Sequence, residues 1–168
     1  LIYQDTYHEL SYRAAHVAGP KSNYVARLNA PDVALEAGVP DVGGGLLLGL
    51  GPWRYDLLGL VLHQEHLLRV YDVACRTVSL HRMRPAPGSQ MEAPYPVSDA
   101  EYLRCVAIAR LAIPYAGLVL TTKEPSGLWR DGCGVGASQL LTGSVANPYD
   151  GWFLAPGQKV PFPIGEAC

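Results

Sequence analysis

Apolar and polar residues are arranged along the chain in a pattern that predicts strands and helices in turn. Short apolar runs typical of buried strands occur at 1–4, 41–48, 76–81, 117–122 and 137–141. Between them, helical spacing is clearest over 54–71, where Leu57, Val61 and Leu68 fall on one face. Shorter helical segments are expected around 12–16, 31–37, 98–113 and 126–133. Strands joined by helices of this length are parallel, so the predicted class is α/β.

Local signals mark the ends of two of the predicted helices. Ser98 followed three positions later by Glu101 is a capping box, and Pro114 ends the same helix. Pro31 suits the first turn of an earlier helix, and Gly38 suits the position just after its C-terminus. These boundaries keep the connections between strands and helices short.

Polar residues follow the end of each predicted strand. They are Gln4 and Asp5, the glycine run 43–45, Arg82 and Arg84, Lys123 and Glu124, and Thr142 and Ser144. The carboxyl ends of parallel strands meet at one edge of a sheet, where α/β barrels build their active sites. The stretch 77–89 is the most informative, because a strand there delivers two arginines into a proline-rich loop. Spacing alone leaves open whether these arginines bind an anion or pair with surface acids.

Two further motifs have two interpretations each. Three consecutive glycines weaken a strand, which favours a place where a ligand approaches the backbone, although a flexible turn would also use them. His63 and His66 lie three residues apart on a predicted helix and could share a metal ion. The sequence places no carboxylate or third imidazole beside them, so a polar helix face is the favoured interpretation.

The composition narrows the classes of function. The 168 residues carry a net charge of −2 with no basic run, which disfavours an electrostatic nucleic-acid binder. No apolar run reaches the roughly 18 residues of a membrane span, and no signal pattern opens the chain. The four cysteines lie about 30 residues apart without CxxC spacing, which argues against a zinc ribbon and favours reduced, cytoplasmic thiols. We therefore expect a cytoplasmic protein without nucleic-acid or membrane partners.

A series of segments, taken together, carries a resemblance to a known family. They are YQDTYHELSY, GPKSNYVARLNAPDVALEAGVPDVG, LLLGL, SLHRMRPAPGS, YPVSD, RLAIPYAGLVLTTKEP and GVGASQLLTGS. In their order and spacing over 1–148 they resemble the second half of the radical S-adenosylmethionine aromatic-amino-acid lyases. These are the tyrosine lyases of thiamine biosynthesis (2-iminoacetate synthase) and of FeFe-hydrogenase maturation. YPVSD and IPYAGLVLTTKEP are more similar to the hydrogenase-maturation branch.

The resemblance implies a fold, a reaction and cofactors. The fold would be the second half of a (β/α)8 TIM-type barrel, about five parallel strands over 1–148 that include the biotin and thiamin synthesis-associated region, followed by a divergent tail at 149–168. In the family, a radical formed from S-adenosylmethionine at a 4Fe-4S cluster leads to cleavage of tyrosine between Cα and Cβ, giving p-cresol and dehydroglycine. The CxxxCxxC motif that holds the cluster is absent from this sequence. We therefore expect the chain to hold no metal and to be inactive alone.

The resemblance also assigns residues by position. It assigns S-adenosylmethionine to Gln4, Asp5, Tyr7, Gly43, Gly45 and Arg82, and the amino-acid substrate to Arg84, Lys123, Thr142 and Ser144. Arg82 would take the methionyl carboxylate, because a guanidinium pairs with a carboxylate through two hydrogen bonds. Several positions depart from the family pattern: Asp5 stands for glutamate, Gly44 for isoleucine, His81 for proline and Lys123 for arginine.

Other interpretations remain beside that of a radical-enzyme fragment. The departures at Asp5, Gly44 and Lys123 favour a non-catalytic remnant or binding module that keeps only anion-binding sites. An unrelated α/β barrel fragment is the third possibility. The start of the chain at Leu1, in what reads as a strand, favours a fragment. An open half-barrel has unpaired edge strands and an uncovered apolar face, so the expected partner is the missing N-terminal half-barrel or a second copy.

Overall fold

The structure, a computed structural model, describes residues 2–84 and 92–142 as one five-stranded sheet with six helices. The strands are β1 (Ile2–Asp5), β2 (Gly43–Leu48), β3 (Thr77–Arg82), β4 (Gly117–Thr121) and β5 (Gln139–Leu141). They lie in the order of the sequence, and every neighbouring pair is parallel. The predicted α/β class with five parallel strands is confirmed. The predicted domain boundary at 148 and the tail lie outside the described residues.

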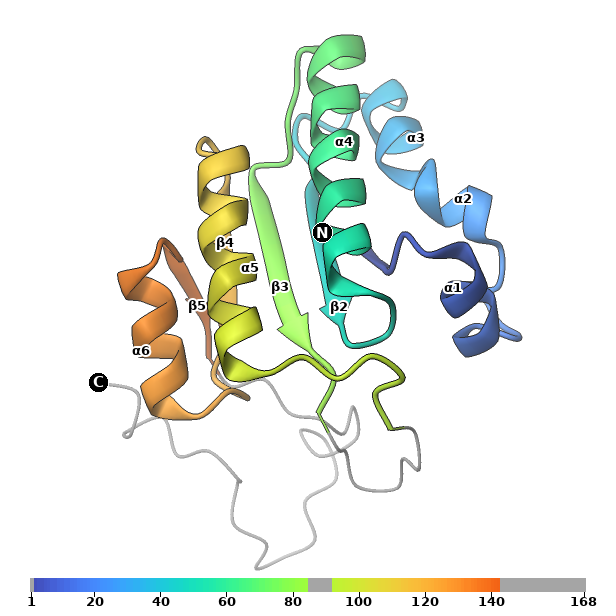
Figure 1. Cartoon of the computed structure of the whole chain (residues 1–168). Helices are drawn as coiled ribbons and strands as arrows, with labels where there is room; N and C mark the ends of the chain where they lie inside the picture. The colour runs from blue at the N-terminus through green and yellow to red at the C-terminus, as the bar shows by residue number, and fades with distance from the viewer. Residues whose placement is uncertain (1, 85–91, 143–168) are drawn as a thin grey trace, which may run out of the picture.

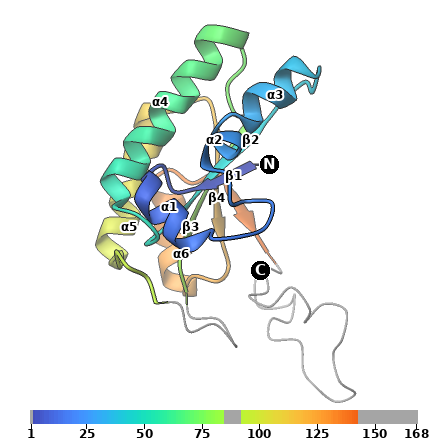
Figure 2. The same ribbon diagram turned by 90° about the vertical axis from the view of Figure 1, so that its right-hand side faces the viewer.

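The helices connect the strands and cover one face of the sheet. They are α1 (Glu9–Ala15), α2 (Tyr24–Leu28), α3 (Ala30–Glu36), α4 (Trp53–Tyr71), α5 (Asp99–Ala112) and α6 (Ser126–Gly134). Figures 1 and 2 show α4 and α5 lying along the same side of the strands. The predicted capping box of α5 is confirmed, with Ser98 Oγ and the Glu101 side chain each accepting the other's backbone N–H. Helix α2 was not predicted, and Asn23 caps it by accepting from the Ala26 N–H.

None of the helices in the described part of the chain combines the length and apolar character needed to cross a membrane.

Strand register sorts the side chains of the sheet into two faces. Even-numbered residues of β2, β3 and β4, such as Leu46, Leu80 and Leu118, are buried in the core beneath the helices. Because side chains alternate along a strand, the odd-numbered residues point to the opposite face. We call that side the inner face; it comprises Tyr3, Gly43, Gly45, Leu47, Thr77, Ser79, His81, Val119 and Thr121. Tyr3, Gly45, Ser79, Val119 and Gln139 lie in one register row across all five strands. Such rows fill the interior of an α/β barrel.

A side chain from a helix binds the backbone of the outer strand β1. Strands β1 and β5 each pair on one side only, so both are edge strands within the described residues. Arg27 of α2 donates from Nε to the Tyr3 carbonyl at 2.7 Å. The carbonyl of an edge strand is thereby satisfied by a side chain rather than by another strand.

Candidate functional site

Arg82 is the centre of a buried ion-pair network at the carboxyl end of the sheet. Its Nε donates to Glu124 Oε1 at 3.0 Å, and its Nη2 donates to the other carboxylate oxygen. Its Nη1 donates to the Val97 carbonyl at 2.9 Å and lies 2.8 Å from Asp99 Oδ1. The Glu124 side chain is 0% exposed and that of Arg82 is 5% exposed. This single guanidinium therefore joins β3 to the loop after β4 and to the start of α5.

The environment of Arg82 stabilises its charged form and provides an acceptor for each of its side-chain nitrogens. Burial disfavours the charged form, but hydrogen bonds to Glu124 and Asp99 outweigh burial and raise the pKa of Arg82. Its guanidinium carbon also lies 4.8 Å from the centre of the Tyr102 ring. All three side-chain nitrogens of Arg82 thus donate to acceptors within the chain. Its assignment to the methionyl carboxylate stays a prediction, and in this arrangement Arg82 positions the loops around it.

Arg84 and Lys123 are the cations at this rim that face solvent. Arg84 donates to the same Glu124 carboxylate, but its side chain is 37% exposed. The backbone N–H of Lys123 donates to Thr121 Oγ1 at 3.3 Å, and its side chain is exposed. No carboxylate oxygen in residues 2–84 and 92–142 lies within 4.0 Å of the Lys123 ammonium. Thr142, just past β5, is exposed, and Ser144 lies outside the described residues. Arg84 contacts Glu124, and Lys123 precedes it in the sequence, so two exposed cations lie in or next to the loop that Glu124 holds.

The end of β1 is held by contacts within the chain. Asp5 adopts a left-handed backbone conformation with φ of 67°. Its Oδ2 accepts from Lys21 Nζ at 2.8 Å and lies 3.0 Å from His16 Nε2. The Asp5 carboxylate, predicted to contact S-adenosylmethionine, is therefore already engaged by two neighbouring side chains.

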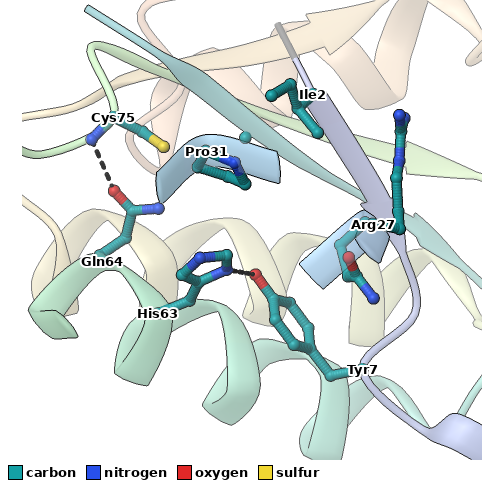
Figure 3. Close-up of a pocket in the computed structure, with 9 residues that line it drawn as sticks. Ile2, Tyr7, Arg27, Pro31, His63, Gln64 and Cys75 are labelled. Carbon is teal, nitrogen blue, oxygen red and sulfur yellow. Dashed lines mark hydrogen bonds between the residues drawn. The ribbon is translucent and has the colours of Figure 1, made fainter. Parts of the chain in front are cut away.

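Gln4 and Tyr7 lie on the helix side of the sheet, around a small cavity of about 10 Å³ (Figure 3). The Tyr7 hydroxyl lies 2.9 Å from His63 Nδ1, and Gln64 Oε1 accepts from the Cys75 N–H at 2.9 Å. Burial raises the pKa of Tyr7, and burial lowers the pKa of His63. A space of this size is at the lower limit for a single water. The structure therefore brings Gln4 and Tyr7 together with Gly44, which lines the same cavity, but not with Gly43 and Gly45, which were predicted to share their ligand.

Gly43 and Gly45 lie on the inner face, and the structure gives Gly45 a packing role. A Cβ on Gly45 would come within 2.4 Å of the Tyr3 ring, so a bare backbone is needed to seat that ring. Gly44 points the other way, where a Cβ would lie 3.4 Å from Cys75 Sγ. Its departure from the family pattern therefore bears on helix packing rather than on a ligand at the inner face.

The inner face also carries polar atoms that sequence reasoning missed. Ser79 Oγ and His81 Nε2 are both buried and have no hydrogen-bond partner among residues 2–84 and 92–142. The His81 ring centre lies 5.4 Å from that of Tyr3. Burial and the nearby Lys123 charge lower the pKa of His81. Strand alternation was the available signal, because it places residues 79 and 81 on the same face as Gly45.

The histidine pair on α4 has a carboxylate neighbour, contrary to the sequence-based interpretation. Asp32 of α3 contacts both histidines. Its Oδ1 lies 2.6 Å from His66 Nε2, and its Oδ2 lies 3.9 Å from His63 Nε2. Spacing along one helix could not reveal it, because it comes from another element. Over 2–84 and 92–142, no group of three histidine, cysteine or acidic side chains is arranged to hold a metal ion.

The described cysteines do not fit an iron–sulfur cluster. Cys75 and Cys105 are buried free thiols, and burial raises the pKa of both, to about 12 for Cys105. A cluster ligand must be a thiolate, which burial in an apolar core disfavours. Cys133 is exposed on α6, and Cys168 lies outside the described residues. The described side chains therefore offer no cluster site.

Comparison with known proteins places these observations in a family context. Residues 79–160 match the Biotin and Thiamin Synthesis associated domain. The 2-iminoacetate synthase of Escherichia coli is 33% identical over 125 residues, which cover 74% of this chain and 33% of that enzyme. A biotin synthase of Acidithiobacillus ferrooxidans is 29% identical over 94 residues, covering 56% of this chain and 28% of that enzyme. The chain thus spans about a third of the length of the curated relatives that it matches.

Solved structures of larger enzymes superpose on this chain. The FeFe-hydrogenase maturase HydG from Carboxydothermus hydrogenoformans superposes with a TM-score of 0.80 at 38% identity, covering 84% of this chain and 33% of that one. A second HydG structure gives a TM-score of 0.79, also at 38% identity, covering 83% of this chain and 31% of that one. Methylornithine synthase (PylB) shares the fold, with a TM-score of 0.63 at 20% identity, over 87% of this chain and 40% of that one.

Proposed function

This chain is a homologue of the C-terminal half of the radical S-adenosylmethionine tyrosine lyases, and we propose that it forms the wall of a barrel that binds tyrosine for cleavage of its Cα–Cβ bond. The inner face of the sheet would line the interior of that barrel. The carboxyl ends of the strands would form its mouth, as in other α/β barrels.

The observation that carries the proposal is the pair of unpartnered polar atoms on the inner face. A buried hydroxyl or imidazole nitrogen without a partner costs free energy, and a ligand that hydrogen-bonds to it removes that cost. Ser79 Oγ and His81 Nε2 are such atoms. Both lie on β3, which Arg84 follows directly, and Lys123 is in the loop after β4, so the polar groups come from one strand, the segment after it and one loop.

Arg84 and Lys123 are the residues that we propose bind the substrate carboxylate. Both are exposed cations beside the buried Glu124, which fixes the loop that carries Lys123. Lys123 stands where the family has arginine, so it would contribute a point charge rather than a two-pronged contact. Thr142, just past β5, would complete the substrate side together with Ser144, which lies outside the described residues. Arg82 would act through Glu124, as a positioning residue.

S-adenosylmethionine is the cofactor implied by the homologues. Of the residues assigned to it, Gly43 and Gly45 on the inner face are the ones that we propose it approaches. When bound and cleaved at an iron–sulfur cluster, it supplies the radical that starts the reaction in this family. Gly43 and Gly45 would let it reach the backbone of β2. We propose that Gln4, Asp5 and Tyr7 instead shape the end of β1, because their polar atoms face the helix side or contact neighbouring side chains. The described residues offer no ligands for that cluster.

A second candidate is a binding module without catalytic activity. The observation that favours it is the engagement of Asp5 and Arg82, whose side chains contact other residues of the chain instead of facing a ligand. Such a module would keep the rim cations for small anions. It would not discriminate tyrosine from other carboxylates.

Calorimetric titration of the 168-residue chain with L-tyrosine, with and without S-adenosylmethionine, tests the proposal. We expect tyrosine to bind, and the Kd to rise about tenfold in Arg84→Gln or Lys123→Gln, because each loses a charge-assisted hydrogen bond. Arg69→Gln, an exposed arginine at the far end of α4, is the matched control and should bind like the wild type. Binding of acetate as tight as that of tyrosine would favour the binding module, and binding of neither ligand would overturn the proposal.

A further inference from the structure

Ser79 and His81 form a polar pair on β3, the middle strand of the sheet. They are two residues apart on β3, so both side chains point to the same side of the sheet. Ser79 is 1% exposed, and neither its hydroxyl nor the buried Nε2 atom of His81 has a partner in the described part of the chain. The other buried polar atoms without partners, Gln4 Oε1 and Asp56 Oδ2, belong to different residues near the end of β1 and on α4. The pair is therefore a local feature of β3.

The surroundings of His81 come from several elements, and each contributes something different. Tyr3 of β1 places its ring 5.4 Å from the imidazole, tilted by 47°. Leu47 of β2 lies beside His81 in register. From the loop after β4, Lys123 disfavours the charged imidazole and Glu124 favours it, and burial adds to the effect of Lys123. The net effect lowers the pKa of His81, so the imidazole is neutral at physiological pH and can donate one hydrogen bond.

We propose that His81 and Ser79, together with Lys123, bind the carboxylate of a small-molecule ligand at the inner face of the sheet. This deepens the proposed function and rests on it, because it adds two residues to the carboxylate site of the same barrel. The hydroxyl of Ser79, an Nε2–H of His81 and the Lys123 ammonium are all donors. A carboxylate offers only acceptors, so it is the chemical complement of these three donors.

His81 would be a specificity-determining residue of this chain. The family pattern has proline at this position, which carries no donor, so the pair is not inherited from that pattern. Two carboxylates could occupy the site: that of an amino-acid substrate and that of the methionyl part of S-adenosylmethionine. Both share the chemistry, and analogues that lack the carboxylate tell them apart.

The test is calorimetric titration of the 168-residue chain with two pairs of ligands. L-tyrosine is compared with tyramine, and S-adenosylmethionine with 5′-methylthioadenosine, because the second member of each pair lacks the carboxylate. The variants are Ser79→Ala, His81→Ala and His81→Gln, whose side-chain amide replaces the donor. His66→Gln on the exposed face of α4 is the control. We expect Ser79→Ala and His81→Ala to weaken one carboxylate ligand about tenfold at pH 7.5, while its carboxylate-free analogue binds all variants equally. If the variants weaken L-tyrosine but not tyramine, the site binds the amino-acid carboxylate; if they weaken S-adenosylmethionine but not 5′-methylthioadenosine, it binds the methionyl carboxylate.

The pH dependence separates a ligand contact from a purely structural role. In the wild type, affinity for the carboxylate should increase as the pH falls through the pKa of His81, because the imidazolium adds a positive charge. His81→Gln should keep most of the affinity at pH 7.5 and lose this increase. If the wild type binds tyrosine or S-adenosylmethionine and the Ser79 and His81 variants bind it equally well, the inference is wrong while the proposed function stands. If the wild type binds neither, both fail.

Discussion

The two faces of the sheet are built on different principles, although they are made by alternate residues of the same strands. On the helix side, the buried ion pair and hydroxyl near the carboxyl end of the sheet have partners: Arg82 pairs with Glu124, and the Tyr102 hydroxyl donates to the Leu80 carbonyl at 3.0 Å. Gln4 Oε1 and Asp56 Oδ2, near the end of β1, are the exceptions on this side, because neither has a partner among the described residues. On the inner face, Ser79 and His81 keep polar atoms without partners. Apolar side chains there, such as Leu47 and Val119, are only partly buried.

This difference separates stability from binding. A polar group that is paired within the chain, such as the Arg82 guanidinium, stabilises the fold and has no free hydrogen-bonding capacity for a ligand. A face that leaves donors unpaired gives up some stability and gains the capacity to bind. Arg82 shows why the type of residue is insufficient to identify a site. Arg82, like Val78 and Leu80, is an even-numbered residue of β3, so its side chain lies on the helix side of the sheet. There it joins the buried ion pair with Glu124 instead of pointing to the inner face.

The largest expected effect concerns the buried ion pair of the helix side. Glu124→Gln leaves the Arg82 charge buried without its carboxylate, and we expect the free energy of unfolding to fall by about 3 kcal/mol. Urea denaturation followed by circular dichroism measures it. Arg84→Gln, which removes the exposed partner of the same carboxylate, should cost less than about 1 kcal/mol. Equal losses for the two variants would contradict the distinction between buried and exposed arginine.

Adjacent glycines of β2 compare the two faces directly. Gly45→Ala places a methyl group 2.4 Å from the Tyr3 ring and 3.1 Å from the Ser79 carbonyl, so we expect a loss of about 2 kcal/mol. Gly44→Ala meets its neighbours at 3.4 Å or more and should change stability by less than about 1 kcal/mol. Tyr3→Ala should reduce the cost of Gly45→Ala in a double-mutant cycle. If the two alanine variants are equally stable, the Tyr3 ring does not lie against Gly45.

Stability should fall when the pH is lowered from 7.5 to 5.5. Burial lowers the pKa of His63 on the helix side and contributes, with Lys123, to lowering that of His81 on the inner face. Near and below the ordinary histidine pKa of about 6.5, the unfolded chain binds more protons than the folded chain, which favours unfolding. Each histidine contributes at most about 1.4 kcal/mol per pH unit. His63→Gln should make the decline shallower in denaturation measured across this range, and an unchanged slope would contradict the role of His63.

The smallest expected effect is also the most diagnostic for the inner face. Ser79→Ala removes a buried hydroxyl that has no partner, so the ligand-free chain should be as stable as the wild type or more stable by up to about 1 kcal/mol. Tyr102→Phe removes a hydroxyl that is hydrogen-bonded and should cost about 1 kcal/mol. Thermal or urea unfolding of the two variants side by side gives the comparison. A cost for Ser79→Ala as large as that for Tyr102→Phe would mean that the Ser79 hydroxyl is satisfied within the fold.

Much of the fold was predictable because its signals are local. The apolar stripe of α4, the Ser98–Glu101 capping box and the glycine after α3 depend on neighbours within a few residues. The five-residue helix α2 was missed because it is too short for a period. The side on which a functional residue lies depends on the exact strand bounds, because a shift of one residue moves every side chain to the other face.

The candidate site was less predictable because its contacts join distant segments. Glu124 lies 42 residues from Arg82, and Asp32 lies 34 residues from His66. Family position suggested a ligand role for Tyr7, whereas its hydroxyl contacts His63, 56 residues away. Ser79 was not singled out in the sequence, and His81 was named only as a departure from the family's proline, since a serine and a histidine within a strand are ordinary.

The central claim is that ligands bind the inner face, and two histidines on opposite sides of the sheet can report on it. The imidazole resonances of His81 and His63 are recorded by NMR in the 168-residue chain while L-tyrosine, and then S-adenosylmethionine, is added. Our account predicts that the His81 signals move with saturation while those of His63, enclosed by Tyr7 and α4, stay in place. Movement of the His63 signals alone, or of neither set, would contradict it.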